Sequence, residues 1–387
     1  MSIGNKIYAE LKGDKVIWMI IALLSMLSIL IVYSSTGTLA FKNRGGNTES
    51  YLFKHVVILG VGLLLTYLCY AMHYLRFRQA APWLILVAVP LLIFTIAMGS
   101  NINSARRWIE IPFIGLSFQT SDFAKLALII FVAREVSKHK DYIKDFKKAF
   151  MPIIVPILIV CFLIAPADLS TALMLFLTTG IMMFVARVDL KYIILLFFLG
   201  VVIFAFLILI HKYAPDFVRL ETWVSRISQF MDSSEVGYQV EQSKMAISNG
   251  ALLGQGPGNS VMRNYLPSPY SDFVYATIIE EYGLVGGFVV LFLYILLFLR
   301  VVRLITKSKK AFGAMVALGL SLNLILQALI NMAVSVDLVP VTGLPLPLVS
   351  MGGTSILFTC ISLGIILSVS KFMESISNTE AQTQTSS

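Results

Sequence analysis

Long apolar runs constrain the fold of this chain more than any other feature of its sequence. A helix needs about 20 predominantly apolar residues to cross the hydrocarbon core of a bilayer. Inside lipid a helix satisfies its own backbone hydrogen bonds, so repeated runs of this length predict membrane-spanning helices. We expect about ten of them, at residues 16–35, 54–72, 82–99, 122–136, 150–166, 170–187, 190–211, 272–304, 311–335 and 352–371.

The composition agrees with a protein that lies almost entirely in the membrane. The 387 residues are 58% hydrophobic and only 13% charged, whereas a soluble globular domain is roughly a quarter charged. A soluble enzyme is therefore excluded. We predict an all-α polytopic protein with an N-terminal segment at 1–15, one transmembrane bundle at 16–371 and a polar, disordered tail at 372–387.

Basic residues in the short loops predict the orientation of the bundle. Lys and Arg are retained on the cytoplasmic side, and here they cluster around residues 6–15, 76–78, 138–148, 187–191 and 300–310. With ten spans all of these segments fall on one side, so both termini should be cytoplasmic. Contact with anionic lipid head groups accounts for the net charge of +9, and nucleic-acid binding is set aside.

Two other features bear on organisation and chemistry. The segment 212–271 is the longest loop, and "YQVEQSKMAISNGALLG" within it predicts a short amphipathic helix that ends in glycine. Loops of this length are usually functional or disordered. Cys69, Cys161 and Cys360 lie within predicted spans without metal-type spacing, so we expect them to be apolar packing residues.

Acidic residues stand at the start of the eighth span, in "YLPSPYSDFVYATIIEEYGLVGG". Asp272 follows two prolines, and one interpretation is a helix-start acid that satisfies free N–H groups. Glu280 lies about 12 Å deeper along a regular helix, and Glu281 points to the opposite side. Carboxylates at such depth are expensive, so each must be paired, protonated or facing a polar cavity.

Cations occur before and within the fourth span, in "NSARRWIEIPFIGLSFQTSDFAKLALI". Arg107 and Trp108 are compatible with ordinary anchoring at a membrane interface. Lys125 lies inside the span, three residues after Asp122, so the two side chains are close enough to form a local ion pair. The alternative is a cation placed for an anionic ligand.

Two further motifs extend this polar set. Asp168 opens the sixth span in "APADLSTALM" and is either a helix cap or a site residue. The prolines and glycines of "VPVTGLPLPLVSMGGTS" forbid a continuous helix, and such backbone survives at membrane depth only inside protein or beside a wet cavity. The outward ends of the helices thus offer two carboxylates with several cations, the composition of a site for an amphiphile with an anionic head: Asp168, Asp272, Arg107, Lys125, Arg219, Arg226 and Lys244.

Four stretches of the chain resemble signature blocks of the SEDS family, the FtsW, RodA and SpoVE proteins of bacterial cell-wall synthesis. They are "RRWIEI" with "FQTSDFAKLAL", "ADLSTA", "YLPSPYSDFVYATIIEEYGLVGG" and "VPVTGLPLPLVSMGGTS", in the family order. The stretch "GQGPGNSVMRNYLPSPYSDF" resembles the FtsW branch most. The resemblance implies ten transmembrane helices and a peptidoglycan glycosyltransferase that polymerises lipid II at the outer face of the cytoplasmic (inner) membrane.

The resemblance also implies roles for particular residues. Asp272 matches the family's essential acid, which we expect to act as general base or to position the acceptor, with a divalent cation (Mg²⁺ or Mn²⁺) left open. Arg107, Trp108 and Lys125 are expected to contact the substrate. Residues expected to be structural or to line the cavity are Glu280, Glu281, Pro345, Pro347, Ser350, Gly352 and Gly353.

Partners and alternatives follow from the same resemblance. We expect a class B penicillin-binding protein and other divisome proteins as partners in septal synthesis. The alternatives are a RodA-like polymerase of cell elongation, a lipid II flippase or transporter, and a non-catalytic scaffold. A transporter would use the same cavity without forming a bond.

Overall fold

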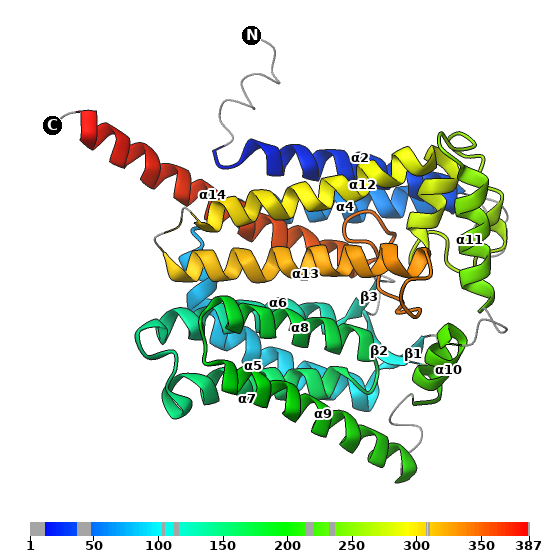
Figure 1. The fold of residues 1–387 in the computed structure, drawn as a ribbon. Helices are drawn as coiled ribbons and strands as arrows, with labels where there is room; N and C mark the ends of the chain where they lie inside the picture. Colours follow the sequence, from blue (N-terminus) through cyan, green and yellow to red (C-terminus); the bar gives the residue numbers. More distant parts are fainter. Residues whose placement is uncertain are drawn as a thin grey trace.

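Long helices that lie side by side form the body of the molecule (Figure 1). The computed structural model describes residues 12–36, 48–102, 105–111, 116–213, 220–231, 237–306, 308 and 310–385. Within these ranges every predicted span coincides with a helix: α2 (Lys15–Ser35), α4 (Thr48–Ala71), α5 (Leu75–Met98), α6 (Thr120–Lys138), α7 (Met151–Ile164), α8 (Leu169–Val185), α9 (Leu190–Tyr213), α12 (Val274–Thr306), α13 (Ala311–Ser335) and α14 (Thr354–Thr385).

The helices have the length and apolar character of membrane spans. Eight in the described part of the chain are long and apolar enough to cross a bilayer. The other two are α8, which has 17 residues, and α6, which carries five charged side chains. Both pack against α13. The predicted all-α, multi-pass membrane fold is therefore confirmed.

Helix α13 forms the centre of the bundle. Its most apolar stretch is 83% buried, whereas that of α9 is only 17% buried. It contacts α6, α8, α12 and α14. Apolar side chains on α9 such as Phe198 and Val201 face outward, as expected for a helix solvated by lipid rather than water. Because other helices surround α13, its polar side chains are enclosed by protein.

The two ends of the bundle differ. α2 begins and α14 ends at the same end, which we call the terminal end, and the opposite end, which we call the loop end, carries shorter elements (Figure 1). α14 continues to Thr385, so helix covers most of the segment 372–387 that the sequence predicted to be disordered. No glycine or proline follows Gly364, and Glu, Ala and Gln in this segment favour helix.

The loop end carries a small antiparallel sheet that the sequence did not predict. Its strands are β1 (Ser100–Ile102), β2 (Ala105–Ile111) and β3 (Leu116–Gln119), in the order β1-β2-β3. Trp108 on β2 lies opposite Gln119 on β3. Because β3 runs directly into α6 at Thr120, the sheet fixes where that helix starts.

The described part of the segment 212–271 contains the α-helices α10 (Leu220–Met231) and α11 (Tyr238–Gly250) and a short 3-10 helix, η3 (Met262–Asn264). The predicted amphipathic helix is α11, and it ends at Gly250, before the Leu252 and Gly254 that the predicted stretch included. It is fastened to the end of α13, because Ser243 Oγ donates to Ser335 O at 2.7 Å. Lys244 Nζ and Asp337 Oδ2, 2.8 Å apart, add an exposed ion pair.

Helix α12 is interrupted at Gly283, where the sequence predicted a continuous span. Gly283 has φ +72° and ψ −177°, a conformation open essentially only to glycine. The segment after α11 repairs the interruption. Gln255 N and Gly256 N donate to Glu280 O and Glu281 O at 2.9 and 3.0 Å, and Leu284 N donates to Ala251 O at 3.0 Å. Backbone groups freed by the break are thus satisfied by the loop.

Candidate active site

Asp272 lies in the turn that precedes α12, at the loop end of the bundle. The helix begins at Val274, so Asp272 is outside it. Its Oδ1 accepts a hydrogen bond from Ser271 Oγ at 3.0 Å. Gly343, at φ +72°, faces the other carboxylate oxygen, and a Cβ there would lie 3.8 Å from Oδ2. The carboxylate is therefore placed beside the broken segment 340–353.

Two arginines and a second acid lie within electrostatic reach of Asp272. Burial raises the pKa of Asp272 above its ordinary value, and Asp168 raises it further. The Ser271 hydrogen bond and the positive charges of Arg107 and Arg226 act in the opposite direction. These four charged residues come from β2, α8, α10 and the turn before α12. Only the tertiary fold brings them together.

Arg226 is held between this cluster and the broken segment. Its Nη1 donates to Thr342 O at 3.4 Å. Burial, and then the nearby charge of Arg107, lower the pKa of its guanidinium, while Asp168 and Asp272 oppose that shift. An arginine stays protonated under all such conditions, so it offers a permanent positive charge beside Asp272.

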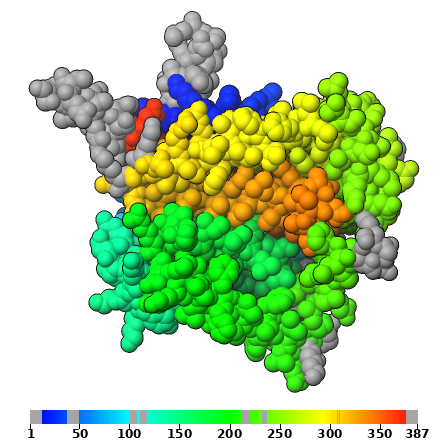
Figure 2. Space-filling view, in the orientation of Figure 1, coloured from blue at the N-terminus to red at the C-terminus, as the bar shows by residue number. Residues whose placement is uncertain are grey.

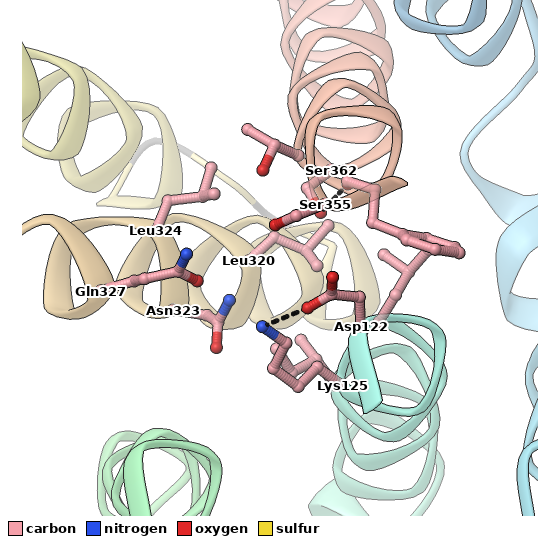
Figure 3. Close-up of a pocket in the computed structure, with 12 residues that line it drawn as sticks. Asp122, Lys125, Leu320, Asn323, Leu324, Gln327, Ser355 and Ser362 are labelled. Atoms are coloured by element: carbon pink, nitrogen blue, oxygen red, sulfur yellow. Dashed lines mark hydrogen bonds and ion pairs between the residues drawn. The ribbon is translucent and has the colours of Figure 1, made fainter. Parts of the chain in front are cut away.

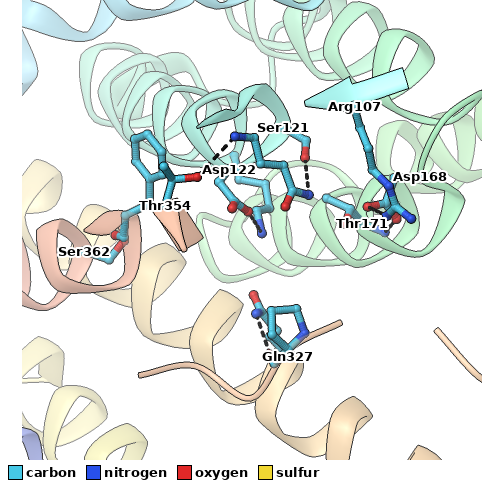
Figure 4. A network of polar contacts seen from close by, with 12 residues as sticks. Arg107, Ser121, Asp122, Asp168, Thr171, Gln327, Thr354 and Ser362 are labelled. Atoms are coloured by element: carbon cyan, nitrogen blue, oxygen red, sulfur yellow. Dashed lines mark hydrogen bonds and ion pairs between the residues drawn. The ribbon is translucent and has the colours of Figure 1, made fainter. Parts of the chain in front are cut away.

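Asp168 combines the two roles considered for it. Its Oδ1 caps α8 by accepting from Thr171 N at 3.1 Å. Its Oδ2 accepts from Arg107 Nη1 at 2.8 Å, in an ion pair whose acid is 6% exposed (Figure 4). The Nε of Arg107 is buried and has no hydrogen-bond partner among the described residues. That N–H is available to an anion entering the cluster.

Asp122 and Lys125 form the predicted local ion pair, with Nζ and Oδ1 2.8 Å apart and both side chains buried. They line a separate cavity of about 20 Å³ between α6, α13 and α14 (Figure 3). Asp122 Oδ2 and Asn323 Oδ1 have no partner among the described residues. The cavity is large enough for one water molecule. Because of its ion pair with Asp122, Lys125 already has a counter-ion.

Lys125→Met is expected to destabilise the protein by about 3–5 kcal/mol, because it leaves Asp122 as an uncompensated buried charge. Thermal unfolding in detergent would measure this loss. The double variant Asp122→Asn/Lys125→Met should recover most of it. If the single variant unfolds at the wild-type temperature, Asp122 does not depend on Lys125 as a buried counter-ion.

Glu280 and Glu281 fasten the loop that follows α11. Glu280 is fully buried and accepts from the hydroxyl of Ser260, from Met262 N at 3.2 Å and from Asn249 Nδ2 at 3.3 Å. Glu281 accepts from the hydroxyl of Ser34 on α2. The buried Oε2 of Glu281 has no hydrogen-bond partner among the described residues, so the structural role expected for both glutamates stays a prediction.

The broken segment is enclosed by protein and tied to several helices. Gln327 Nε2 on α13 donates to Pro345 O at 2.8 Å, and the hydroxyl of Tyr294 on α12 donates to Pro347 O. Gly352 and Gly353 precede α14. At the other side of this turn, Thr354 Oγ1 donates to Ser117 O and accepts from Gln119 N, both at 3.2 Å (Figure 4).

The two remaining cations predicted for the site are Lys244 and Arg219. Lys244 lies at the rim, half exposed, in its ion pair with Asp337. Arg219 lies outside the described residues. Trp108 is partly buried in the sheet next to Arg107. Asn331 and Gln327 were not predicted for the site, although each is a polar side chain within the apolar helix α13.

A large apolar cavity is lined in part by chain neighbours of two residues in the charged cluster. It has a volume of about 500 Å³ and lies between α7, α8 and α9, with Ile227 of α10 at its boundary. Ile227 follows Arg226 directly in the chain, and Leu169 at the start of α8 follows Asp168. In the space-filling view, the surface is hollowed between the green helices and the orange part of the chain (Figure 2).

These features define a polytopic membrane protein with a charged site at one end of its helical bundle. The chain belongs to the FtsW/RodA/SpoVE family, whose model, described as "Cell cycle protein", matches residues 14–375. The family predicted from the sequence is confirmed.

Relatives match over nearly the full length of the chain. The probable peptidoglycan glycosyltransferase FtsW of Trichlorobacter lovleyi is 31% identical over 96% of both chains. The protein of the same name from Coxiella burnetii is 30% identical over 91% of this chain and 95% of its own. The rod shape determining protein RodA of Thermus thermophilus has the same fold, with a TM-score of 0.67 and 24% identity over 94% of this chain and 98% of its own.

A further solved structure describes the structural coordination of polymerization and crosslinking by a peptidoglycan synthase complex. One of its chains matches with a TM-score of 0.70 and 24% identity, over 93% of this chain and 98% of its own. At this identity the two solved structures support the fold.

Proposed function

We propose that this protein is a peptidoglycan glycosyltransferase of the FtsW type, which polymerises lipid II during septal synthesis in cell division. The observation that carries the proposal is the placement of Asp272 within electrostatic reach of two arginines, one of which, Arg226, directly precedes a residue that lines an apolar cavity. The relatives named FtsW support the division role over elongation.

The proposed site faces outward from the bacterial cytoplasmic membrane. Five exposed lysines in residues 138–148 lie at the terminal end, opposite Asp272 (Figure 1). Basic loops are retained in the cytoplasm. Both termini are then cytoplasmic, and Asp272 meets the leaflet in which lipid II is polymerised.

The proposed reaction is a displacement at the anomeric carbon of the donor sugar. The 4-hydroxyl of the acceptor attacks this carbon, the new C–O bond forms, and the bond to the pyrophosphate oxygen breaks. Asp272 accepts the hydroxyl proton. Arg107 and Arg226 supply positive charge as undecaprenyl pyrophosphate leaves, which is the electrostatic stabilisation such a leaving group requires. The proton then passes from Asp272 to water.

The apolar cavity suits the lipid part of the same substrate. Its walls are formed by side chains such as Phe176, Phe197 and Leu207, which offer a polyprenyl chain contacts equivalent to those of lipid tails. With Ile227 at its boundary and Arg226 in the charged cluster, a chain in this cavity places its pyrophosphate near the arginines. A soluble sugar nucleotide would make no use of such a cavity.

The expected Mg²⁺ or Mn²⁺ stays a prediction. Among the described residues no group of three His, Cys, Asp or Glu side chains is placed to hold a metal ion. Asp168 is also already paired with Arg107. This donor set does not fit a metal held by the protein alone, and Mg²⁺ commonly binds through substrate phosphates with only one or two carboxylates. Asp272 and the two arginines therefore carry the proposed reaction.

A class B penicillin-binding protein is the proposed partner, together with other divisome proteins. The likeness to a chain of a peptidoglycan synthase complex supports such a pairing. The test of the function is polymerisation of lipid II by the purified protein, alone and with its cognate transpeptidase, with the glycan products resolved on a gel. Polymer supports the transferase. No polymer in either case would favour transport or scaffolding.

The rate of polymerisation is expected to fall as the pH is lowered. This fall should begin at a higher pH than an ordinary carboxyl group would give. Burial raises the pKa of Asp272, so the carboxylate needed as base is lost as pH decreases through that raised value. Measuring kcat/KM between about pH 4 and pH 8 would locate the acid limb. A rate that stays constant down to about pH 4 would contradict the assignment of Asp272 as the base.

A further inference from the structure

The main chain around Asp272 is held by an unbroken series of hydrogen bonds. The carbonyl oxygens of Tyr270, Ser271 and Asp272 accept from Met351 N at 2.8 Å, Ser350 Oγ at 2.7 Å and Asn331 Nδ2 at 2.8 Å. All three donors belong to α13 or the broken segment. Asp272 precedes α12, so the regular hydrogen bonds of that helix do not position it.

Asn331 joins both sides of this contact through one nitrogen. Its Nδ2 donates to Asp272 O and to Leu344 O, each at 2.8 Å, so both amide hydrogens are used. The opposite orientation would place the amide oxygen against two carbonyl oxygens. Leu344 follows Gly343, the residue that faces the Asp272 carboxylate. Asn331 is 1% exposed, so solvent does not compete for its hydrogen bonds.

Ser350 has a comparable double role. Its hydroxyl donates to Ser271 O and accepts from Leu346 N at 2.8 Å, which closes the turn of the broken segment on itself. Behind it, Ser28 Oγ donates to Val349 O at 2.9 Å. Ser28 Oγ also lies 2.8 Å from His55 Nε2. Because the serine hydrogen is already used, the imidazole Nε2–H is the donor in that pair. The turn is thus supported by the buried Ser350 and, behind it, by the buried pair Ser28 and His55.

We propose that Asn331 and Ser350 are positioning residues, which hold the Asp272 carboxylate in the geometry that the transfer requires by fixing its main chain against the broken segment. This rests on the proposed function, in which Asp272 takes the acceptor proton. Among the described residues, neither side chain is hydrogen-bonded to the carboxylate itself. Displacement of a reacting group by about 1 Å can reduce a rate by 10²-fold, so loss of either contact should lower kcat more than it raises KM.

The experiment compares Asn331→Asp and Ser350→Ala with the wild-type protein. Asp has nearly the shape of Asn, but its carboxylate cannot donate to either carbonyl. Ser350→Ala is the milder change and protects the test against a failure of Asn331→Asp to fold. The matched control is Ser321→Ala, because Ser321 is also buried on α13 but donates only to Leu318 O in its own helix.

Two readouts are needed, polymerisation kinetics and hydrogen–deuterium exchange of residues 266–276 and 343–353. We expect kcat to fall about ten-fold or more in both variants, with KM for lipid II within about two-fold and faster exchange in both segments. Ser321→Ala should change neither. Wild-type kcat in Ser350→Ala would overturn the proposal, as would faster exchange without a loss of kcat. If the wild type makes no polymer, the proposed function fails. If hydrogen–deuterium exchange is unchanged in Ser350→Ala, the contact between Ser350 and Ser271 does not hold the turn.

Discussion

Asp272→Asn is expected to lower the rate of lipid II polymerisation by about 10²–10⁴-fold while leaving the fold intact. The amide has the shape of the carboxyl group and can still accept from Ser271 Oγ, but it cannot accept a proton. The main-chain contacts of residue 272 do not involve its side chain, so they should persist. Glycan length and yield on a gel, with equal amounts of monodisperse protein, would measure the loss.

The control for this variant is Asp189→Asn. This variant makes the same Asp-to-Asn substitution at the other end of the protein, where the Oδ1 of Asp189 accepts from Lys191 N at 3.1 Å. Its rate should equal that of the wild type. Polymer of normal yield from Asp272→Asn would remove Asp272 from the role of base and direct attention to the acceptor-positioning role.

Gly283→Ala is expected to destabilise the protein by about 3 kcal/mol or more. At φ +72° and ψ −177° an alanine is strained, and its Cβ would overlap Leu252 O in the segment that repairs the interruption of α12. Either the hydrogen bonds of Leu284 N and Gln255 N or the loop itself would have to give way. Thermal unfolding in detergent and the yield of monodisperse protein would report this loss.

The matched control is Gly60→Ala on α4. A Cβ at Gly60 meets no atom within 4 Å, and alanine is favoured over glycine inside a helix. This variant should be as stable as the wild type or slightly more so. If Gly283→Ala matches Gly60→Ala in stability, the interruption of α12 is not a fixed element of the fold.

Sequence reasoning located the candidate site residues better than it explained them. Asp272, Arg107, Asp168 and Arg226 were all predicted to lie at the outward ends of the helices, as parts of a site for an amphiphile with an anionic head. Their mutual placement was not predictable, since they come from separate elements of the chain. Lys125 was predicted for the substrate, yet the structure places it with Asp122 in a separate cavity.

The number, order and approximate limits of the membrane helices were determined by the sequence alone, because each apolar run must satisfy its own backbone in lipid and can do so only as a helix. The tertiary structure decided everything that depends on contacts between distant segments. The interruption at Gly283 is tolerated only because residues 251–256 supply its missing hydrogen bonds. The position of Asp272 depends in the same way on Asn331 and Ser350, whose contacts span 59 and 79 residues of chain, a separation at which no local pattern specifies a partner.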